Sequence, residues 1–234
     1  MSCKSIIIAI FLVSFTLSSC KEEVEEDKLN LIFIYADDWG YGDLSIHGST
    51  FCETPNIDKL AAEGIDFQSF CVNNPVCSPS RTAIMTGHFP ARYSIHGHFA
   101  DVKSHIRRDM PDWLDPDAPM LPRLLKNAGY KTAHFGKWHL SNTHVGDAPD
   151  PTHYGYDEYG AFNLPHRLHQ MSTDSTVERT IDFIERNHKF PLFINVWLHE
   201  SHTPHYPKEQ YMNQFAHLDS QKQVYAAILA EADA

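Results

Sequence analysis

The segment from Cys77 to Gly87 carries the residues best suited to chemistry in this 234-residue chain. It reads Cys-Ser-Pro-Ser-Arg-Thr-Ala-Ile-Met-Thr-Gly, so a thiol precedes a proline-containing helix start and Arg81 follows one turn later. Pro79 is compatible with a first helical turn, because its missing N–H would have no partner inside the helix. Free backbone N–H groups and the helix dipole would then face an anion beside Cys77. The segment therefore indicates an anion site with a reactive side chain.

Two adjacent carboxylates follow the first apolar segment. Leu29 to Ala36 is a continuous apolar run rich in β-branched and aromatic residues, which predicts a strand buried on both faces. Asp37 and Asp38 come directly after it and offer the oxygen ligands that hard divalent cations prefer. Alone, such a pair is usually solvated surface; its place at a strand end argues against a plain surface turn, and the Cys77 segment downstream favours a cation site.

Two later apolar segments end in lysine or histidine. The strand predicted at Tyr130 to Phe135 leads into Lys137 and His139, which would share one face of an extended segment. The strand predicted at Leu192 to Leu198 leads into a His-x-x-His segment, 199–202. In parallel sheets, ligands bind beyond the carboxyl ends of the strands, so we expect these side chains to converge on one rim.

Helical patterns separate these strands and predict an α/β fold with a largely parallel central sheet. The stretch from Ala100 to Pro119, rich in proline and charge, is typical of a long surface insertion and contains no recognisable catalytic pattern. A further strand is predicted at Ile65 to Phe70. The predicted helices are Thr54 to Glu63, Cys77 to Met85, Leu121 to Ala128, Asp174 to Asn187 and Gln221 to Ala232.

The N-terminus has the pattern of an export signal. Lys4 precedes an apolar run from Ile6 to Phe15 that is too short to span a bilayer, and Leu-Ser-Ser-Cys20 closes it. That ending resembles the lipobox of bacterial lipoproteins, in which Cys20 would be lipidated after removal of a signal peptide, 1–20; a plain secretory signal is the alternative. The charged tether 21–28 begins with Lys-Glu-Glu, which resembles the surface-export signal of Bacteroidota lipoproteins. We therefore expect an exported, membrane-anchored chain, periplasmic or on the cell surface, including that of an outer membrane.

The Cys77 segment resembles the signature of the formylglycine-dependent sulfatases, Cys/Ser-x-Pro-Ser-Arg followed by Leu/Met-Thr-Gly. A chance match is rarer than about one in a million at average residue usage. The resemblance implies an alkaline-phosphatase-like fold, a largely parallel sheet with helices on both faces, for residues 29–234. It also implies that a formylglycine-generating or radical maturase enzyme oxidises Cys77 to formylglycine, and that Asp37, Asp38 and residue 77 bind Ca²⁺.

The same resemblance assigns the remaining catalytic roles. Arg81 would hold the aldehyde hydrate, and the Gly-Lys-Trp-His-Leu match makes Lys137 a sulfate contact and His139 the partner of the formylglycine hydroxyl. His202 would lie near the leaving-group oxygen; we prefer it to His199 because Thr-Pro follows it. In the implied reaction, one hydrate hydroxyl attacks sulfur, and deprotonation of the other expels sulfate.

The chain departs from the family pattern after His202. Sulfatases complete the calcium site with an Asp-Asn or Asp-His pair and another lysine further downstream, and this sequence stops at Ala234 before any candidate. We therefore expect the N-terminal part of a catalytic domain, truncated at its C-terminus, with weak calcium binding and little activity. A sulfated-glycan-binding module and a phosphonate or phosphodiester hydrolase are the alternatives. The predicted substrate is a sulfated polysaccharide or its oligosaccharides.

Charge and cysteine content fit this interpretation. The formal charge of −11 and the absence of a basic stripe argue against a nucleic-acid partner. An acidic surface would repel a polysulfated polymer, so capture requires a local cationic pocket. Of the five cysteines, Cys52 and Cys71 have no assigned role; they could pair in an oxidising compartment or stay as free thiols.

Overall fold

The computed structural model describes residues 28–163 and 172–234. The predicted signal peptide, Cys20 and all of the charged tether except Lys28 lie outside the described residues. Within them, no helix has the length and apolar character that crossing a membrane would require.

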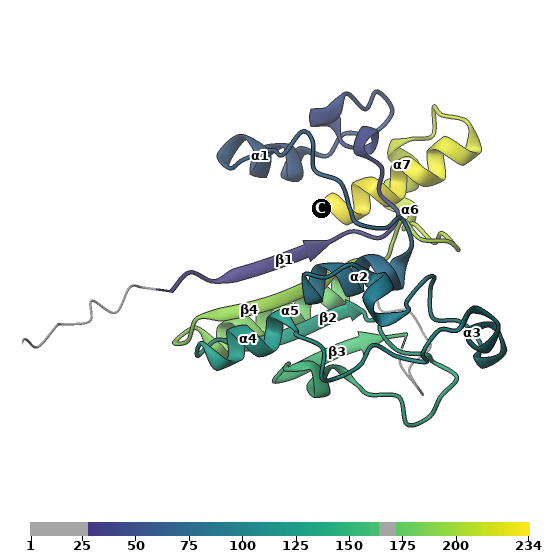
Figure 1. The fold of residues 1–234 in the computed structure, drawn as a ribbon. Coiled ribbons are helices and arrows are strands. Elements are labelled where there is room, and N and C mark those ends of the chain that lie inside the picture. Colours follow the sequence, from purple (N-terminus) through teal and green to yellow (C-terminus); the bar gives the residue numbers. More distant parts are fainter. Residues whose placement is uncertain (1–27, 164–171) are drawn as a thin grey trace, which may run out of the picture.

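Four parallel strands form the centre of the fold in the order β1-β4-β2-β3, with helices on both faces (Figure 1). The sheet register aligns Trp197 with Tyr35 on one side and with Gly136 on the other, so three strands end at the same level. The α/β fold with a largely parallel sheet is confirmed. The strands are β1 (Leu31–Tyr35), β2 (Lys131–Lys137), β3 (Glu158–Phe162) and β4 (Leu192–Trp197).

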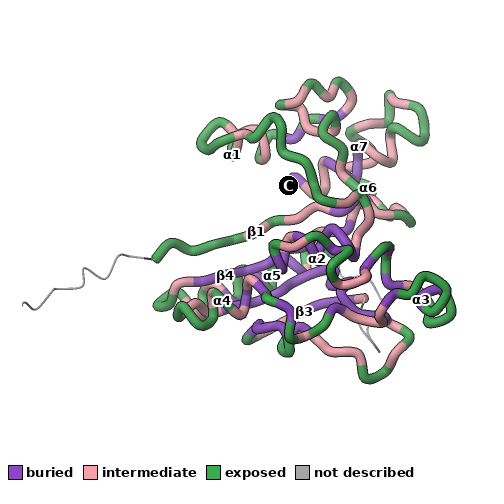
Figure 2. Tube along the Cα trace, viewed as in Figure 1, coloured by how far each residue is buried: buried purple, intermediate pink, exposed green. Residues whose placement is uncertain are grey.

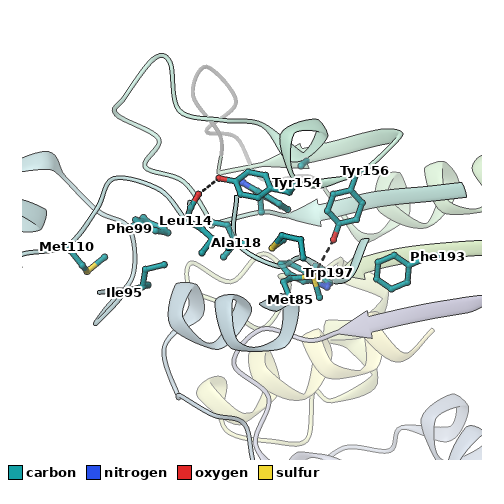
Figure 3. Packing of buried hydrophobic residues seen from close by; sticks show 14 residues of the cluster. Met85, Ile95, Phe99, Met110, Leu114, Ala118, Tyr154, Tyr156, Phe193 and Trp197 are labelled. Atoms are coloured by element: carbon teal, nitrogen blue, oxygen red, sulfur yellow. Dashed lines mark hydrogen bonds between the residues drawn. The ribbon is translucent and has the colours of Figure 1, made fainter. Parts of the chain in front are cut away.

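Strand β4 shows how the sheet is packed on its two faces. Ile194 and Val196 pack with Phe183 of α5 (Thr173–Asn187) on one face. Phe193 and Trp197 alternate with them and join the larger cluster on the opposite face, which Figure 3 shows with Met85 and Tyr156. This larger cluster also contacts α2 (Cys77–Thr86) and α4 (Leu121–Asn127). Because successive side chains of a strand point to opposite faces, a continuous apolar run is what a doubly covered strand requires.

Strand β1 lies at the edge of the sheet, so the prediction that it is buried on both faces is wrong. Phe33 and Tyr35 are partly buried against the larger cluster, but Ile32 and Ile34 are 49% and 58% exposed. Helix α5 contacts β2 and β4 and leaves the corresponding face of β1 uncovered. Figure 2 shows the start of β1 exposed beside a buried β4.

Beside the sheet, α1 (Pro55–Glu63) and α7 (Ser220–Asp233) lie together on the β1 side (Figure 1). The carboxylate of Asp233 accepts hydrogen bonds from the backbone N–H groups of Asn56 at 3.0 Å and Ile57 at 2.8 Å. It thus satisfies two of the free donors at the start of α1 from a distant part of the chain. Helix α6 (Glu209–Gln214), which the sequence did not predict, packs against α7.

One predicted strand does not form, and one strand of the structure was not predicted. Ile65 to Phe70 forms no strand, and Ile65, Phe67 and Phe70 are exposed, so apolar composition alone misled the assignment. Strand β3 was not predicted, because its short sequence Glu-Tyr-Gly-Ala-Phe lacks a strong strand pattern. Cys52 and Cys71 are both free thiols, one buried and one exposed.

The segment from Ala100 to Pro119 is more than a surface insertion, contrary to its prediction. It contains α3 (Val102–Arg108), and after this helix Met110 and Leu114 are buried in the larger cluster. Figure 3 shows Met110 and Leu114 in this cluster together with Ile95 and Phe99. The segment is therefore fixed to the core, despite its charge.

One buried histidine makes folding pH-dependent. His134 of β2 packs edge-on against Trp138 and Trp197 with ring centroids 5.0 and 4.7 Å away. Burial, together with the charge of Arg81, lowers the pKa of His134 to about 3. The folded chain therefore binds fewer protons than the unfolded chain, so this stabilisation is complete above pH ~6.5 and is lost as the pH falls towards 3.

We predict that His134→Phe flattens the dependence of the free energy of unfolding on pH. Phenylalanine keeps an aromatic ring but takes up no proton, and the Lys137 carbonyl that His134 contacts still accepts a hydrogen bond from Arg81. Urea titrations between pH 6 and 4 should show a slope smaller by about 1.4 kcal/mol per pH unit. Parallel profiles for the two proteins would contradict this account.

Candidate active site

A buried carboxylate with three nitrogen partners lies at the centre of the site. Asp37 accepts hydrogen bonds from Arg81 Nη2 at 3.0 Å and Lys137 Nζ at 2.5 Å. His199 Nδ1 donates a third to Asp37 Oδ2 at 2.9 Å. Burial alone would raise the pKa of Asp37, but the hydrogen bond from His199 and the charges of Arg81 and Lys137 hold it well below its ordinary value. Asp37 is therefore an anion at neutral pH.

The sheet order brings these groups together. Asp37 follows β1, His199 follows β4 and Lys137 ends β2, and these three strands are neighbours. Gly136 allows the close approach of β2 and β4, because a Cβ at this position would lie 2.0 Å from the Trp197 carbonyl oxygen. Its φ of 101° also favours glycine. The predicted convergence of strand ends on one rim thus occurs here.

Arg81 is fixed within the protein and has no contact with solvent. Its guanidinium lies 5.3 Å from the ring centre of Tyr35 and 4.6 Å from that of Trp197. Nη1 donates to the Lys137 carbonyl oxygen at 3.2 Å while Nη2 binds Asp37. Two aromatic faces and two acceptors therefore fix the plane of the guanidinium.

Cys77 is the first residue of α2, and its Sγ lies 3.5 Å from Lys137 Nζ. Lys137 thus contacts both the thiol and Asp37. Burial raises the pKa of the Cys77 thiol and the charge of Asp37 adds to this, whereas Lys137 and Arg81 only partly offset it. Since the thiolate is the nucleophilic form, unmodified Cys77 is poorly activated at neutral pH despite its place at a helix N-terminus.

The two histidines that follow β4 both lie at the site. A ring nitrogen of His202, Cys77 Sγ and an Asp37 carboxylate oxygen all lie within 4.8 Å of one another. The His202 ring stacks on His199 with centroids 4.4 Å apart. His202 is thus the histidine beside Cys77, while His199, which the sequence analysis set aside, binds Asp37.

His139 leaves the strand in a left-handed conformation with φ 52°, so the extended segment ends before it. Its Nε2 donates to the Phe99 carbonyl oxygen at 2.9 Å, which leaves Nδ1 as the unprotonated nitrogen. Nδ1 is buried and makes no hydrogen bond within the described ranges. Burial, with the nearby charge of Lys137, lowers the pKa of His139 to about 3, so the ring is neutral.

The Asp38 side chain makes no hydrogen bond or ion pair with another residue of the described ranges. Asp38 is exposed, has a φ of 60°, and lines with Asp37, Asn74 and Cys77 a pocket of about 230 Å³. Carboxylate oxygens from Asp37 and Asp38 are donors that fit a hard divalent cation. They supply fewer than the roughly six to eight ligands that Ca²⁺ takes, so these residues alone fit a weak site.

Sequence reasoning missed Tyr35, Trp197 and His199. Each stands at or just beyond the end of a strand, which was the available signal. Their contacts depend on β1 and β4 being neighbours, and this strand order cannot be read from the sequence.

Comparison with known proteins gives a consistent result. A family model described as "Sulfatase" matches residues 29–234. N-acetylgalactosamine-6-sulfatase of Mus musculus is 29% identical over 218 residues, which are 78% of this chain and 42% of the mouse protein.

Solved structures support the same fold. One, determined in complex with its substrate D-glucosamine-2-N,6-O-disulfate, is 26% identical with a TM-score of 0.63 and covers 81% of this chain and 38% of the other. A protein of the alkaline phosphatase superfamily from Vibrio parahaemolyticus has a TM-score of 0.58 at 19% identity, with coverage of 88% and 48%. The chain spans less than half the length of each of these three proteins.

We predict that the two adjacent aspartates differ sharply in their contribution to stability. Asp37→Asn leaves Arg81 and Lys137 buried without a counter-charge, and this should lower the free energy of unfolding by about 3–5 kcal/mol. The exposed Asp38→Asn should change it by less than about 0.5 kcal/mol. Because the pKa of Asp37 is lowered, its contribution is complete at neutral pH and is lost only as the pH falls below about 4.

Urea unfolding at pH 7 checks this difference, with Asp38→Asn as the matched control. Equal losses for the two variants would show that the buried ion pairs do not stabilise the fold.

Proposed function

This chain belongs to the sulfatase family, and we propose that its site hydrolyses sulfate esters of saccharides through a formylglycine formed from Cys77. The observation that carries the proposal is the position of Cys77, at the start of α2 and 3.5 Å from Lys137 Nζ. The mouse relative is named for a 6-sulfated N-acetylgalactosamine, and the disulfated glucosamine is the substrate of the solved neighbour. Both support a sulfated saccharide as the substrate class.

Modification of Cys77 would supply the nucleophile that the unmodified thiol does not provide. The raised pKa leaves the thiol protonated and weakly nucleophilic at neutral pH. A formylglycine-generating or radical maturase enzyme would oxidise the side chain to an aldehyde, whose hydrate supplies one hydroxyl to attack sulfur and a second whose deprotonation expels sulfate. The proposed partner is therefore this maturase.

The cations of the site are positioned to bind the sulfate group. Lys137 reaches the side chain of residue 77 directly, and the free N–H groups of the first turn of α2 face the same position. Arg81 is buried behind them and is held rigidly by its aromatic and carboxylate contacts. Because these groups are fixed before substrate arrives, little reorganisation is needed to stabilise developing negative charge.

The histidines are suited to moving protons. His139 donates from Nε2 to a carbonyl, so its Nδ1 lone pair can accept a proton from the reacting hydroxyl. His202 lies beside residue 77 and is the candidate to assist the leaving alcohol. His199 is already occupied by Asp37, which leaves it less able to serve in this way.

Asp37 and Asp38 are the residues that would hold Ca²⁺ at this site. When bound, the cation would add Lewis-acid stabilisation of charge on the sulfate oxygens. Asp38 is the more available ligand, because Asp37 is shared with three nitrogen partners.

We predict that co-expression with a maturase converts Cys77 to the aldehyde, and that sulfate release from an arylsulfate and from N-acetylgalactosamine-6-sulfate depends on it. Cys77→Ala should abolish release. Lys137→Met should lower the rate by a factor on the order of 10²–10³, by analogy with loss of one preorganised donor. Lys131→Met is the matched control at the start of the same strand, where Lys131 lies over Phe190.

Peptide mass spectrometry of residue 77 and ion chromatography of released sulfate provide the readouts. An intact thiol despite an active maturase would contradict the proposal, as would sulfate release that survives Cys77→Ala. Binding of the saccharide without turnover would instead support a glycan-binding module. Faster hydrolysis of a phosphodiester or phosphonate would reassign the substrate.

A further inference from the structure

We propose that Arg108 and His98 form a rim beside the Cys77 site, in which the guanidinium supplies the positive charge and the imidazole supplies a hydrogen bond, and that this rim binds a second acidic group of the saccharide, either a sulfate or a carboxylate. This proposal rests on the proposed function, because it assumes that one sulfate ester occupies the site at Cys77. Neither residue has a role in the reaction derived above. Arg108 lies in the stretch from Ala100 to Pro119, whose sequence shows no catalytic pattern, and His98 lies just before this stretch.

The backbone beside His98 is fixed to the catalytic machinery. Phe99 N–H donates to Ser78 Oγ at 3.1 Å, and Ser78 is the residue directly after Cys77. The Phe99 carbonyl accepts the hydrogen bond from His139, and Ala100 N–H donates to His105 Nε2 at 2.8 Å. Figure 3 shows Phe99 within the same cluster as Ile95. His98 is therefore held next to the site by three elements: α2, the end of β2 and α3.

The side chain of His98 is exposed, whereas its neighbours Gly97 and Phe99 are buried. Its ring centre lies 6.1 Å from that of His139. Burial lowers the pKa of His98, and the charges of Arg108 and Lys137 lower it further. His98 is thus within electrostatic reach of Lys137, and its exposed ring can offer a hydrogen bond to a ligand.

Arg108 reaches this position because residue 97 is glycine. A Cβ at Gly97 would lie 2.8 Å from Arg108 Nη1, so the guanidinium lies across the surface that a side chain would otherwise cover. Arg108, in the last turn of α3, therefore places its positive charge beside His98. A guanidinium presents paired N–H donors that match the geometry of a sulfate or carboxylate.

Within the described ranges, Arg108 also has no partner, unlike the residue beside it. Arg107 donates from Nη2 to Ser104 Oγ at 2.8 Å. Arg108 makes no hydrogen bond or ion pair with any residue in the ranges 28–163 and 172–234. The whole chain has 30 acidic and 19 basic residues, yet no acidic side chain of the described ranges pairs with this guanidinium, which leaves it available to an external anion. Lys137 and Arg81, by contrast, are already bound to Asp37.

The experiment compares binding of three probes to the chain with unconverted Cys77, so that turnover does not interfere. The probes are N-acetylglucosamine-6-sulfate, D-glucosamine-2-N,6-O-disulfate, and a disaccharide of glucuronic acid and N-acetylgalactosamine-6-sulfate. Isothermal titration at low salt should show that the native chain binds at least one doubly charged probe about tenfold more tightly than the monosulfated probe, as one charge-assisted contact would give.

Arg108→Ala should reduce this preference to within about twofold, while the Kd of the monosulfated probe stays unchanged. Arg107→Ala is the matched control and should leave all three Kd values as they are. His98→Ala should reduce the preference in the same direction. If only the disulfated probe loses its tighter binding, the rim recognises a sulfate. If only the uronate probe loses it, the rim recognises a carboxylate.

If Arg108→Ala keeps the preference for the doubly charged probes, or if Arg107→Ala loses it to the same extent, the proposed rim is wrong. Binding of the monosulfated probe would in that case still support the proposed function. Failure of the native chain to bind any of the probes would overturn both proposals.

Discussion

The carboxylate of Asp37 is the interaction on which the rest of the site depends. Arg81 and Lys137 are almost completely buried, and burying a cation without a partner costs several kcal/mol even after the protein relaxes. Asp37 provides the counter-charge to both, and the hydrogen bond from His199 completes its environment. A buried ion pair of this kind is weak evidence for stability by itself, but removal of one partner leaves a charge that nothing compensates. This need for a counter-charge therefore holds together Asp37, Lys137 and His199, which lie at the ends of three neighbouring strands.

This arrangement has a chemical consequence at residue 77. Lys137 Nζ donates a hydrogen bond to Asp37 and lies 3.5 Å from Cys77 Sγ, so a cation stands beside the position proposed for the sulfate group. The same anionic carboxylate disfavours a thiolate, and the raised pKa of Cys77 follows from burial and from Asp37. The site is thus well suited to bind an anion and poorly suited to use an unmodified cysteine as nucleophile. The proposed oxidation of residue 77 would reconcile these two properties.

The sequence predicted the buried strands and the polar residues at their ends better than it predicted their surroundings. The apolar run of β4 and the polar residues after it were readable, because a doubly covered strand and an abrupt polar end both leave a clear pattern. The edge position of β1 could not be read from the sequence, because Ile32 and Ile34 give the same apolar pattern whether or not a helix covers them. His199 was set aside because its role depends on β1 lying beside β4, a contact between residues 162 positions apart. Arg108 was missed because its position depends on the space above Gly97.

The central claim is that Asp37 and Lys137 act as one unit, and a double-mutant cycle tests it most directly. The free energies of unfolding of the native chain, Asp37→Asn, Lys137→Met and the double variant are measured in urea at pH 7. If the pair is coupled through a buried ion pair, the double variant should lose less stability than the sum of the single variants, with an interaction energy of about 2 kcal/mol or more. Additive losses, within about 0.5 kcal/mol, would contradict the account, because they would mean that each side chain is stabilised independently of the other.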